Sequence, residues 1–300
     1  MDFKITTTAF EGFALIRREP KTILVWAGVS LITSLVFGVA TALFGLGGLR
    51  NGLATPTPAA AGVALISQLA MALLGLLLAA VLGGAVYRAI LRPEQPAWAR
   101  LRIGADEGRL MGLWVIMGLV FVGCTLVAMI PVLILGSIAG LLLAGTAGGP
   151  RVVIVIGYLL FLVILAGFAT RLSLAGPMTF SEQRLQVFGS WKLTKGRFWK
   201  LLGVYALVAL ILTPLYLLFF AVYGGATYLS VGGDWNKAWQ EIIQPYSTSM
   251  AGYFTPARTV YIVLAAGLGA VMNGLMYAPS AVIYRALVGD GAESKADVFS

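Results

Sequence analysis

The segment 190–200 holds the residues with the most recognisable chemistry in this sequence. It reads SWKLTKGRFWK and combines four cations with three large aromatic side chains. Lysine and arginine donate charge-assisted hydrogen bonds to phosphate or carboxylate oxygens, and tryptophan favours the boundary between water and apolar surroundings. The segment could therefore bind nucleic acid, line an active site or lie at a membrane surface. The elements that position it decide among these three interpretations.

Two residue counts restrict the catalytic chemistry open to the chain. The sequence has no histidine, which removes the commonest general base and the commonest metal ligand. Cys124 is the only cysteine, so neither an intrachain disulfide nor a cysteine zinc cluster can form. The carboxylate pairs at Asp106 and Glu107 and at Glu11 and Glu19 lie among arginines, which favours solvated charge balance over acid catalysis. We predict no catalytic residue, no metal site, no cofactor and no enzymatic activity.

The composition predicts that lipid surrounds most of the chain. Of its 300 residues, 59% are hydrophobic and 11% are charged, and the mean hydropathy is +0.92. A helix needs about 20 apolar residues to cross a hydrocarbon core of about 30 Å. Six runs qualify, at 23–46, 61–87, 110–144, 152–170, 198–230 and 259–283. The sequence therefore predicts an all-α, polytopic membrane protein with six transmembrane helices. The two longest runs should tilt or bend, with Pro131 and Pro214 as natural places.

The distribution of cations orients these six spans. Seventeen of the 21 lysine and arginine residues lie before the first span, after the even spans or in the C-terminal tail, and four lie on the other side. The positive-inside rule then places both termini in the cytoplasm. Splitting 110–144 into two spans would move the cation-rich segment 171–200 to the outside, so we predict one span there.

An internal repeat organises the predicted spans. A helix breaker followed by a cation precedes each odd span, with the breakers 88 residues apart, at Pro20-Lys21, Gly108-Arg109 and Gly196-Arg197. We predict one domain over 1–288, built from three pseudo-repeats of an interfacial helix and a helical hairpin. The repeats cover about 1–91, 92–176 and 177–288. Residues 289–300 are predicted to form a disordered cytoplasmic tail.

The predicted interfacial helices carry their own start signals. Thr8 with Glu11, and Thr179 with Glu182, have the spacing of capping boxes, in which both side chains satisfy free backbone N–H groups. Pro96 suits the first turn of the middle helix. Each helix is expected to stop at the breaker before the next span.

The third interfacial helix, predicted to begin at Thr179 and to stop at Gly196, places the segment 190–200 at the membrane surface. Its large apolar side chains share one face, and Arg184 and Lys192 lie at the edges of that face. Cations in this layer attract anionic headgroups by about 1 kcal/mol each. We predict anionic membrane lipids as partners and no nucleic acid, because no nucleic-acid-binding motif accompanies the segment. The predicted headgroup-anchoring residues are Arg88, Arg109, Arg171, Arg184, Trp191, Lys192, Lys195, Arg197, Trp199, Lys200 and Arg285.

Charged residues are missing from the middle of the predicted spans, which disfavours proton-coupled or sodium-coupled transport. Among the neutral polar residues at depth, Asn273 and Gln68 are candidates for an intramembrane polar contact. They could contact a ligand or form interhelical hydrogen bonds, and for Asn273 we favour the second. The many glycines could serve packing within the chain, with a protein partner or in a homo-oligomer.

Two segments lie between spans on the outer side. In 231–257, Trp235 and Trp239 recur at helical spacing after Asp234, which predicts a capped interfacial helix. The segment 45–60 is rich in glycine and proline and is predicted to be flexible.

The run 190–196, followed by Phe198 and Trp199, resembles a signature of uncharacterised proteobacterial polytopic proteins. These proteins are similar to the membrane domain of glycerophosphodiester phosphodiesterases. The resemblance mainly covers 171–210 and implies a multi-pass protein of the bacterial inner (cytoplasmic) membrane. The soluble catalytic barrel of the full phosphodiesterases is expected to be absent, so no catalytic position carries over.

These features together predict a non-enzymatic membrane protein that organises lipid or a partner complex. The alternative is a channel or transporter for a neutral or lipidic molecule, with a path between the repeats. Membrane-bound lipid hydrolysis is a third, weaker hypothesis.

Overall fold

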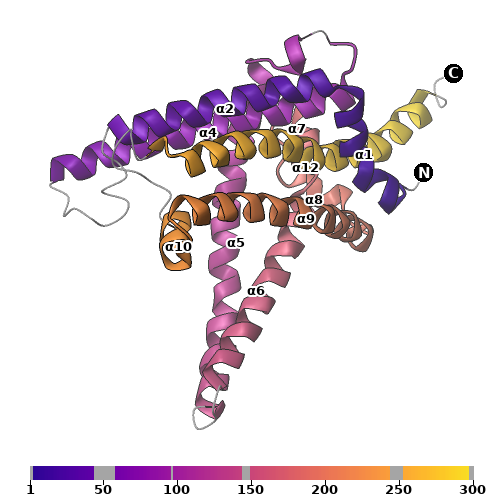
Figure 1. Cartoon of the computed structure of the whole chain (residues 1–300). Coiled ribbons are helices and arrows are strands. Elements are labelled where there is room, and N and C mark those ends of the chain that lie inside the picture. Colours follow the sequence, from indigo (N-terminus) through magenta and orange to yellow (C-terminus); the bar gives the residue numbers. More distant parts are fainter. Residues whose placement is uncertain (1–2, 44–57, 96, 144–148, 244–252, 297–300) are drawn as a thin grey trace. The chain divides into compact units, whose positions relative to one another are not determined.

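The computed structural model describes residues 3–43, 58–95, 97–143, 149–243 and 253–296 (Figure 1). This part of the chain is helical and contains no strand, which confirms the all-α prediction. Contacts divide the chain into two compact units, which are considered separately. The first unit comprises 1–9, 103–206 and 279–300, and the second comprises 10–102 and 207–278.

Among the described residues, six helices are long and apolar enough to cross a membrane, as predicted, and the chain is a multi-pass membrane protein. They are α2 (Pro20–Leu43), α4 (Pro58–Leu91), α5 (Ala105–Leu143), α6 (Gly149–Leu172), α9 (Phe198–Ser230) and α12 (Pro256–Ala296). Residues 110–143 of the predicted run 110–144 lie within one helix, α5, rather than two, and residue 144 is outside the described residues. Both α5 and α9 continue through their internal prolines, Pro131 and Pro214.

The first unit is built on a hairpin of α5 and α6, which run antiparallel to each other (Figure 1). Small residues allow the close approach, because a Cβ atom at Gly157 would lie 3.0 Å from Cγ1 of Val132. Two short helices pack at the end where α5 begins and α6 ends. They are α7 (Ala175–Glu182) and α8 (Gly189–Leu193), which contact each other and the hairpin.

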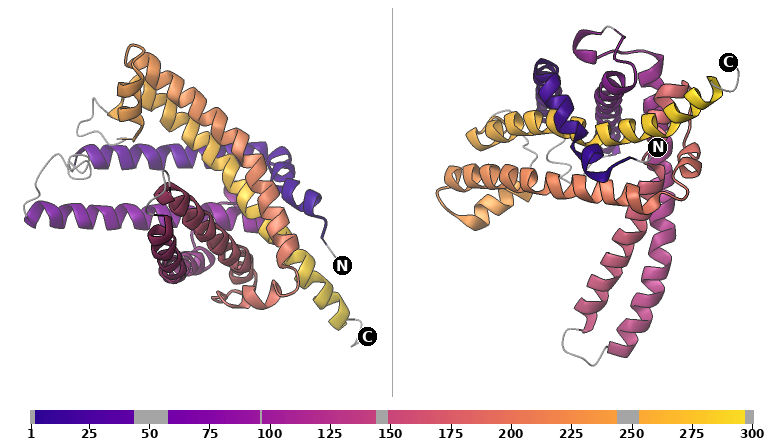
Figure 2. Two further views of the ribbon diagram at one scale, coloured as in Figure 1. Left: turned by 90° about the horizontal axis from the view of Figure 1, so that it is seen from below. Right: turned by 90° about the vertical axis from the view of Figure 1, so that its right-hand side faces the viewer.

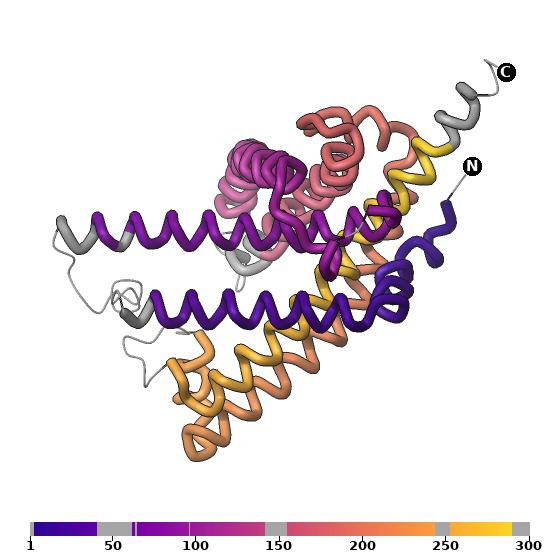
Figure 3. Tube along the Cα trace, turned by 90° about the horizontal axis from the view of Figure 1, so that it is seen from above, coloured from indigo at the N-terminus to yellow at the C-terminus, as the bar shows by residue number. Residues whose placement is uncertain are grey.

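The second unit contains two pairs of helices. Helix α2 pairs with α4, and the part of α9 in this unit pairs with the part of α12. Figure 3 shows α2 and α4 side by side, running in opposite directions. Residues 207–230 of α9 and 256–278 of α12 also run side by side (Figure 2). Aromatic rings join them, with 4.7 Å between the ring centroids of Tyr223 and Tyr261. The hairpins are therefore present, whereas the threefold repeat stays a prediction.

The first predicted interfacial helix exists with different ends. Helix α1 (Ile5–Arg18) begins three residues before Thr8, whose backbone N–H donates to the carbonyl of Lys4. Thr8 therefore lies inside the helix, and the predicted capping box is wrong. The predicted stop is nearly correct, because α1 ends at Arg18 and α2 begins at Pro20.

The middle interfacial helix does not form, and this prediction is wrong. Pro96, the predicted start, is outside the described residues, and the described part of 92–104 contains a single short 3₁₀ helix, η1 (Trp98–Arg100). Helix α5 already begins at Ala105, so Gly108 lies inside it and interrupts nothing. The physical reason is that side chains distant in sequence, Trp26 and Arg88, bind the carbonyls of Ala99 and Arg100.

The third interfacial helix is broken into α7 and α8. Gln183 ends α7 in the left-handed conformation, with φ at 55°. The hydroxyl of Thr179 accepts a hydrogen bond from the backbone N–H of Gln186 at 3.1 Å, so it closes the loop after α7 instead of capping a helix. The prediction of a single helix between Thr179 and Gly196 is therefore wrong, as is that of its capping box.

The capped helix in the outer segment is confirmed as α10 (Trp235–Ile243). The carboxylate of Asp234 accepts hydrogen bonds from the backbone N–H groups of Asn236 at 2.9 Å and Lys237 at 3.2 Å. The backbone N–H groups of Asn236 and Lys237, which lack partners within the first turn of the helix, are therefore both bound by the Asp234 side chain. Trp235 and Trp239 are exposed, and Ala238 is buried.

Acidification is expected to loosen the start of α10. The hydrogen bond from the backbone of Lys237, with that of Asn236, holds the pKa of Asp234 below its usual 3.8. The stabilisation is therefore complete above pH 3.8 and is lost as the pH falls through the lower folded pKa. Backbone NMR shifts of Asn236 and Lys237 should report this transition. In the Asp234→Asn variant, which retains an acceptor, the transition should vanish, and an unchanged transition would contradict the assignment.

Two predicted irregular segments lie partly outside the described residues. Of the predicted flexible segment 45–60, residues up to 57 are outside, whereas α4 already includes 58–60. Of the predicted tail 289–300, residues 297–300 are outside. Helix α12 extends through Ala296, so the prediction of disorder is wrong for 289–296.

Candidate functional site

Arg171, at the C-terminal end of α6, organises the segment 190–200. Its Nη1 donates a hydrogen bond to the carbonyl of Thr194 at 3.0 Å. Its guanidinium carbon lies 5.8 Å from the ring centroid of Trp191 and 5.1 Å from that of Phe198. Both distances are in the range of cation–π attraction. Arg171 therefore holds three residues of the 190–200 segment in place.

Ser190 fixes the same segment from inside the unit. Its buried hydroxyl donates to the carbonyl of Arg171 at 2.7 Å and accepts from the backbone N–H of Leu174 at 3.1 Å. A backbone carbonyl near the end of α6 and a backbone N–H after it are thus satisfied by one side chain. Ser190 and Thr194 are both 0% exposed, so the inner side of the segment is a rigid frame.

Gly196 then turns the chain into α9. Its φ is 79°, a left-handed conformation that other residues rarely adopt. The backbone N–H of Arg197 donates to the carbonyl of Thr194 at 3.2 Å, and α9 starts at Phe198. The turn predicted at this glycine is therefore present.

The outer side of the segment is basic and aromatic. We call it the basic–aromatic surface. It consists of seven exposed residues: Phe188, Trp191, Lys192, Lys195, Arg197, Trp199 and Lys200. Trp199 is 78% exposed and Trp191 is 42% exposed. Lys192, Lys195 and Arg197 form no side-chain ion pair within the described residues. The segment 188–200 also contains no carboxylate. The surface therefore presents exposed cations on a backbone that Ser190 and Thr194 hold in place.

The remaining predicted anchors have other surroundings. Arg109 pairs with Asp106 at 2.7 Å, and Arg184 pairs with Glu182 at 2.9 Å, which neutralises part of each charge. Arg285 is exposed on α12. Arg88 is 1% exposed and donates to the backbone carbonyl of Arg100. The prediction that Arg88 contacts headgroups is wrong, because its charge is buried in the second unit.

The two intramembrane polar candidates do not form a common site. Asn273 donates from Nδ2 to the carbonyl of Gly269 at 2.7 Å, four residues earlier in its own helix. The bond replaces the interhelical one that we expected. Gln68 is exposed on α4. Their arrangement therefore identifies no polar path.

Sequence reasoning missed a second polar centre around Glu19, Trp26 and Arg100. In the sequence, Arg100 is one cation among 21, and Trp26 is one residue of the first apolar run. No sequence signal pairs Glu19 with Arg100, because 81 residues separate them.

Within the described residues, no group of three or more acidic or cysteine side chains could hold a metal ion. No protein-family model, curated protein or solved structure matches the chain.

Proposed function

We propose that this chain organises anionic phospholipid through its basic–aromatic surface, as a non-enzymatic protein of the bacterial inner membrane. The observation that carries the proposal is the contrast between the two sides of one segment. Ser190 and Thr194 fix its inner side, whereas its outer side carries exposed tryptophan and the cations Lys192, Lys195 and Arg197, which form no side-chain ion pair within the described residues. Such a surface offers phosphate groups several donors without requiring the backbone to become ordered on binding.

The expected location at the cytoplasmic face follows from the distribution of cations. A leaflet rich in anionic lipid has a negative surface potential, which attracts lysine and arginine near the surface. Trp199 at the start of α9 is suited to the headgroup layer, where its ring is partly hydrated. The resemblance of 190–199 to the bacterial polytopic proteins supports the same location. A protein partner or a second copy could share this surface with lipid.

One observation favours the alternative of passage for a lipidic molecule. An open apolar pocket of about 500 Å³ lies between α5 and α6. It is lined by Met129, Val132, Leu133, Gly136, Ser137, Gly157, Tyr158 and Phe161. An acyl chain would suit its apolar walls. Accelerated exchange of a labelled lipid between the leaflets of proteoliposomes would favour this function over organisation.

Neutralising two cations of the surface is expected to weaken its binding of phosphatidylglycerol. The Lys192→Gln, Lys195→Gln double variant should lose about 2 kcal/mol at low ionic strength, which is about a 30-fold loss of affinity. Both side chains are exposed, so the fold should persist. Native mass spectrometry of the protein in neutral detergent, titrated with the lipid, measures the loss.

The matched control is the Lys192→Arg, Lys195→Arg double variant, which keeps both charges. It should bind phosphatidylglycerol as the wild type does, and added salt should weaken wild type and control alike. Equal affinity of the glutamine variant and the arginine variant would refute the proposed lipid contact.

A further inference from the structure

The turn before α5 has a backbone conformation that other features of the molecule must maintain. Ala99 has φ at 49° and Arg100 has φ at 60°, so two consecutive non-glycine residues are left-handed. Side chains with a Cβ atom are disfavoured in this region, and such residues persist only where their surroundings fix them. The side chains and contacts that keep Ala99 and Arg100 in this conformation therefore also fix the position of the Arg100 side chain.

Two buried side chains fix this turn from within the second unit. The indole Nε1 of Trp26 donates to the carbonyl of Ala99 at 2.9 Å, and Nη1 of Arg88 donates to the carbonyl of Arg100. Trp26 is 0% exposed and Arg88 is 1% exposed. Both carbonyls of the left-handed pair are therefore bound by side chains that have little freedom to move.

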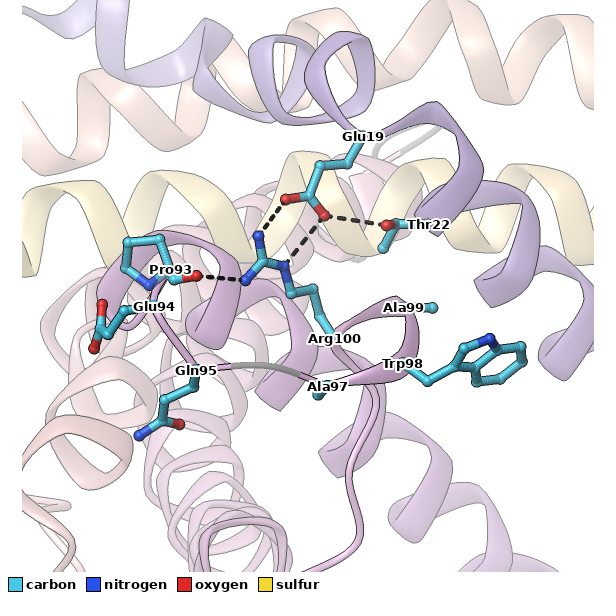
Figure 4. Close-up of a pocket in the computed structure, with 9 residues that line it drawn as sticks. All are labelled: Glu19, Thr22, Pro93, Glu94, Gln95, Ala97, Trp98, Ala99 and Arg100. Atoms are coloured by element: carbon cyan, nitrogen blue, oxygen red, sulfur yellow. Dashed lines mark hydrogen bonds and ion pairs between the residues drawn. The ribbon is translucent and has the colours of Figure 1, made fainter.

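The turn directs the guanidinium of Arg100 against Glu19 (Figure 4). Nη2 of Arg100 lies 2.8 Å from Oε1 of Glu19, and its Nε lies 3.4 Å from Oε2. Nη1 donates to the carbonyl of Pro93 at 2.8 Å. Thr22 donates to the same carboxylate at 3.1 Å. The guanidinium is therefore held on two sides.

Three of the five N–H donors of Arg100 are used in these bonds. Within the described residues, one N–H remains on each terminal nitrogen. A pair of N–H groups on a rigid guanidinium matches the oxygens of a phosphate. Glu19 supplies the charge that keeps Arg100 in place without occupying these donors.

Arg100 lines an open cleft of about 750 Å³ that also contains a second carboxylate. The side chain of Glu94 is exposed and forms no ion pair or hydrogen bond with another described residue. Gln95 and Trp98 complete the polar and aromatic lining, and Trp98 is 73% exposed. The cleft therefore offers donors for an anion and a carboxylate for a cation.

The cleft lies where two antiparallel spans end together. Helix α2 begins at Pro20, one residue after Glu19, and α4 ends at Leu91, two residues before Pro93. Because each of these helices is long enough to cross the hydrocarbon core, their shared end lies at the level of the lipid headgroups. Lipid headgroups are thus the phosphates closest to Arg100.

We infer that this cleft binds the phosphoethanolamine group, with phosphate at Arg100 and the primary ammonium at Glu94. A choline headgroup has no N–H to donate to Glu94, and a glycerol headgroup has no positive charge. The cleft thereby differs from the basic–aromatic surface, which has cations only and favours net negative lipid. The inference stands on separate residues and does not require the proposed function.

The test compares phosphatidylethanolamine, phosphatidylcholine and phosphatidylglycerol with equal acyl chains, titrated into the full chain in neutral detergent. Glu94→Gln removes the charge of an exposed side chain and should not affect folding. The matched control is Glu241→Gln, which removes a carboxylate from α10, outside the cleft lining. Native mass spectrometry gives the three affinities for each protein.

The wild type and Glu241→Gln should prefer phosphatidylethanolamine to phosphatidylcholine by about tenfold, which is typical of one charge-assisted hydrogen bond. Glu94→Gln should abolish this preference. The Lys192→Gln, Lys195→Gln variant should keep it, which separates this site from the proposed function. No preference in the wild type, or a preference retained by Glu94→Gln, would overturn the inference.

Soluble phosphoethanolamine distinguishes the two sources of the ligand. If it displaces phosphatidylethanolamine, the headgroup alone is a sufficient ligand for the cleft. If it does not displace phosphatidylethanolamine although Glu94→Gln abolishes the preference for this lipid, the ligand is the whole lipid with its acyl chains. Either result supports recognition of the ammonium by Glu94.

Discussion

Replacing Trp26 with alanine is expected to lower the free energy of unfolding by about 3–5 kcal/mol. The indole is 0% exposed, so its removal leaves a cavity, and the carbonyl of Ala99 loses its donor. The left-handed conformations of Ala99 and Arg100 cost about 1–3 kcal/mol each and would lose part of what maintains them. Unfolding of the protein in mixed micelles by dodecyl sulfate, followed by circular dichroism, measures the change.

Two further variants separate the contributions to this effect. Trp26→Phe keeps most of the ring but removes the donor, so it should cost about 1 kcal/mol. Trp98→Ala removes a tryptophan that is 73% exposed in the same unit, so it should change stability by less than about 0.5 kcal/mol. If Trp26→Ala were as stable as Trp98→Ala, the buried indole would not support the turn.

The six spans could be predicted because lipid leaves the backbone few choices. A long apolar run in hydrocarbon must satisfy its own N–H and carbonyl groups, and a helix does this within the run. Residues 110–143 show the strength of this constraint, since they lie in one helix even though they include Pro131. The apolar composition of 20 or more consecutive residues thus predicts a helix without any knowledge of tertiary contacts.

The turn at Ala99 and Arg100 could not be predicted because its determinants are distant in sequence. Trp26 and Ala99 are 73 residues apart, and Glu19 and Arg100 are 81 apart. Locally, Pro96 and the following residues have the pattern of a helix start. The bonds from distant side chains override that pattern, since they bind carbonyls that a helix would have used itself.

The break at Gln183 has a similar origin. Glu182 accepts hydrogen bonds from Gln186 at 2.8 Å and Arg184 at 3.0 Å, and Tyr284, 102 residues away, donates to it at 3.5 Å. The spacing of Thr179 and Glu182 is that of a capping box, but both side chains serve the loop after α7. A local motif therefore identified the right residues and assigned them the wrong partners.

Some cations of the candidate sites are exposed and others bind backbone carbonyls, and the sequence does not reveal which will do which. Lys192 and Lys195 are exposed, as their place in a polar segment predicts. Arg88 and Arg171 also end spans, yet each donates to the backbone carbonyl of a following turn. An arginine near a helix end can face headgroups or bind carbonyls of the next segment, and only the path of the chain decides which.

Replacing Gly12 with leucine is expected to lower the free energy of unfolding by about 3 kcal/mol, at the upper end for overpacking. A Cβ atom at Gly12 would lie 2.6 Å from Cα of Leu275 and 2.9 Å from the carbonyl oxygen of Gly274. Because these are backbone atoms, no side-chain rotation can relieve the collision, and α1 must move away from α12. Unfolding by dodecyl sulfate in mixed micelles measures the loss.

Gly28→Leu is the matched control, since a Cβ atom at Gly28 in α2 meets nothing within 4 Å. Glycine inside a helix costs about 0.5–1 kcal/mol relative to alanine, so this variant should be at least as stable as the wild type. A difference between the two leucine variants would show that contact with α12, rather than the added side chain itself, requires glycine at position 12. Equal stability of both variants would mean that α1 does not pack against the backbone of α12, and the description of the second unit would then be wrong at this contact.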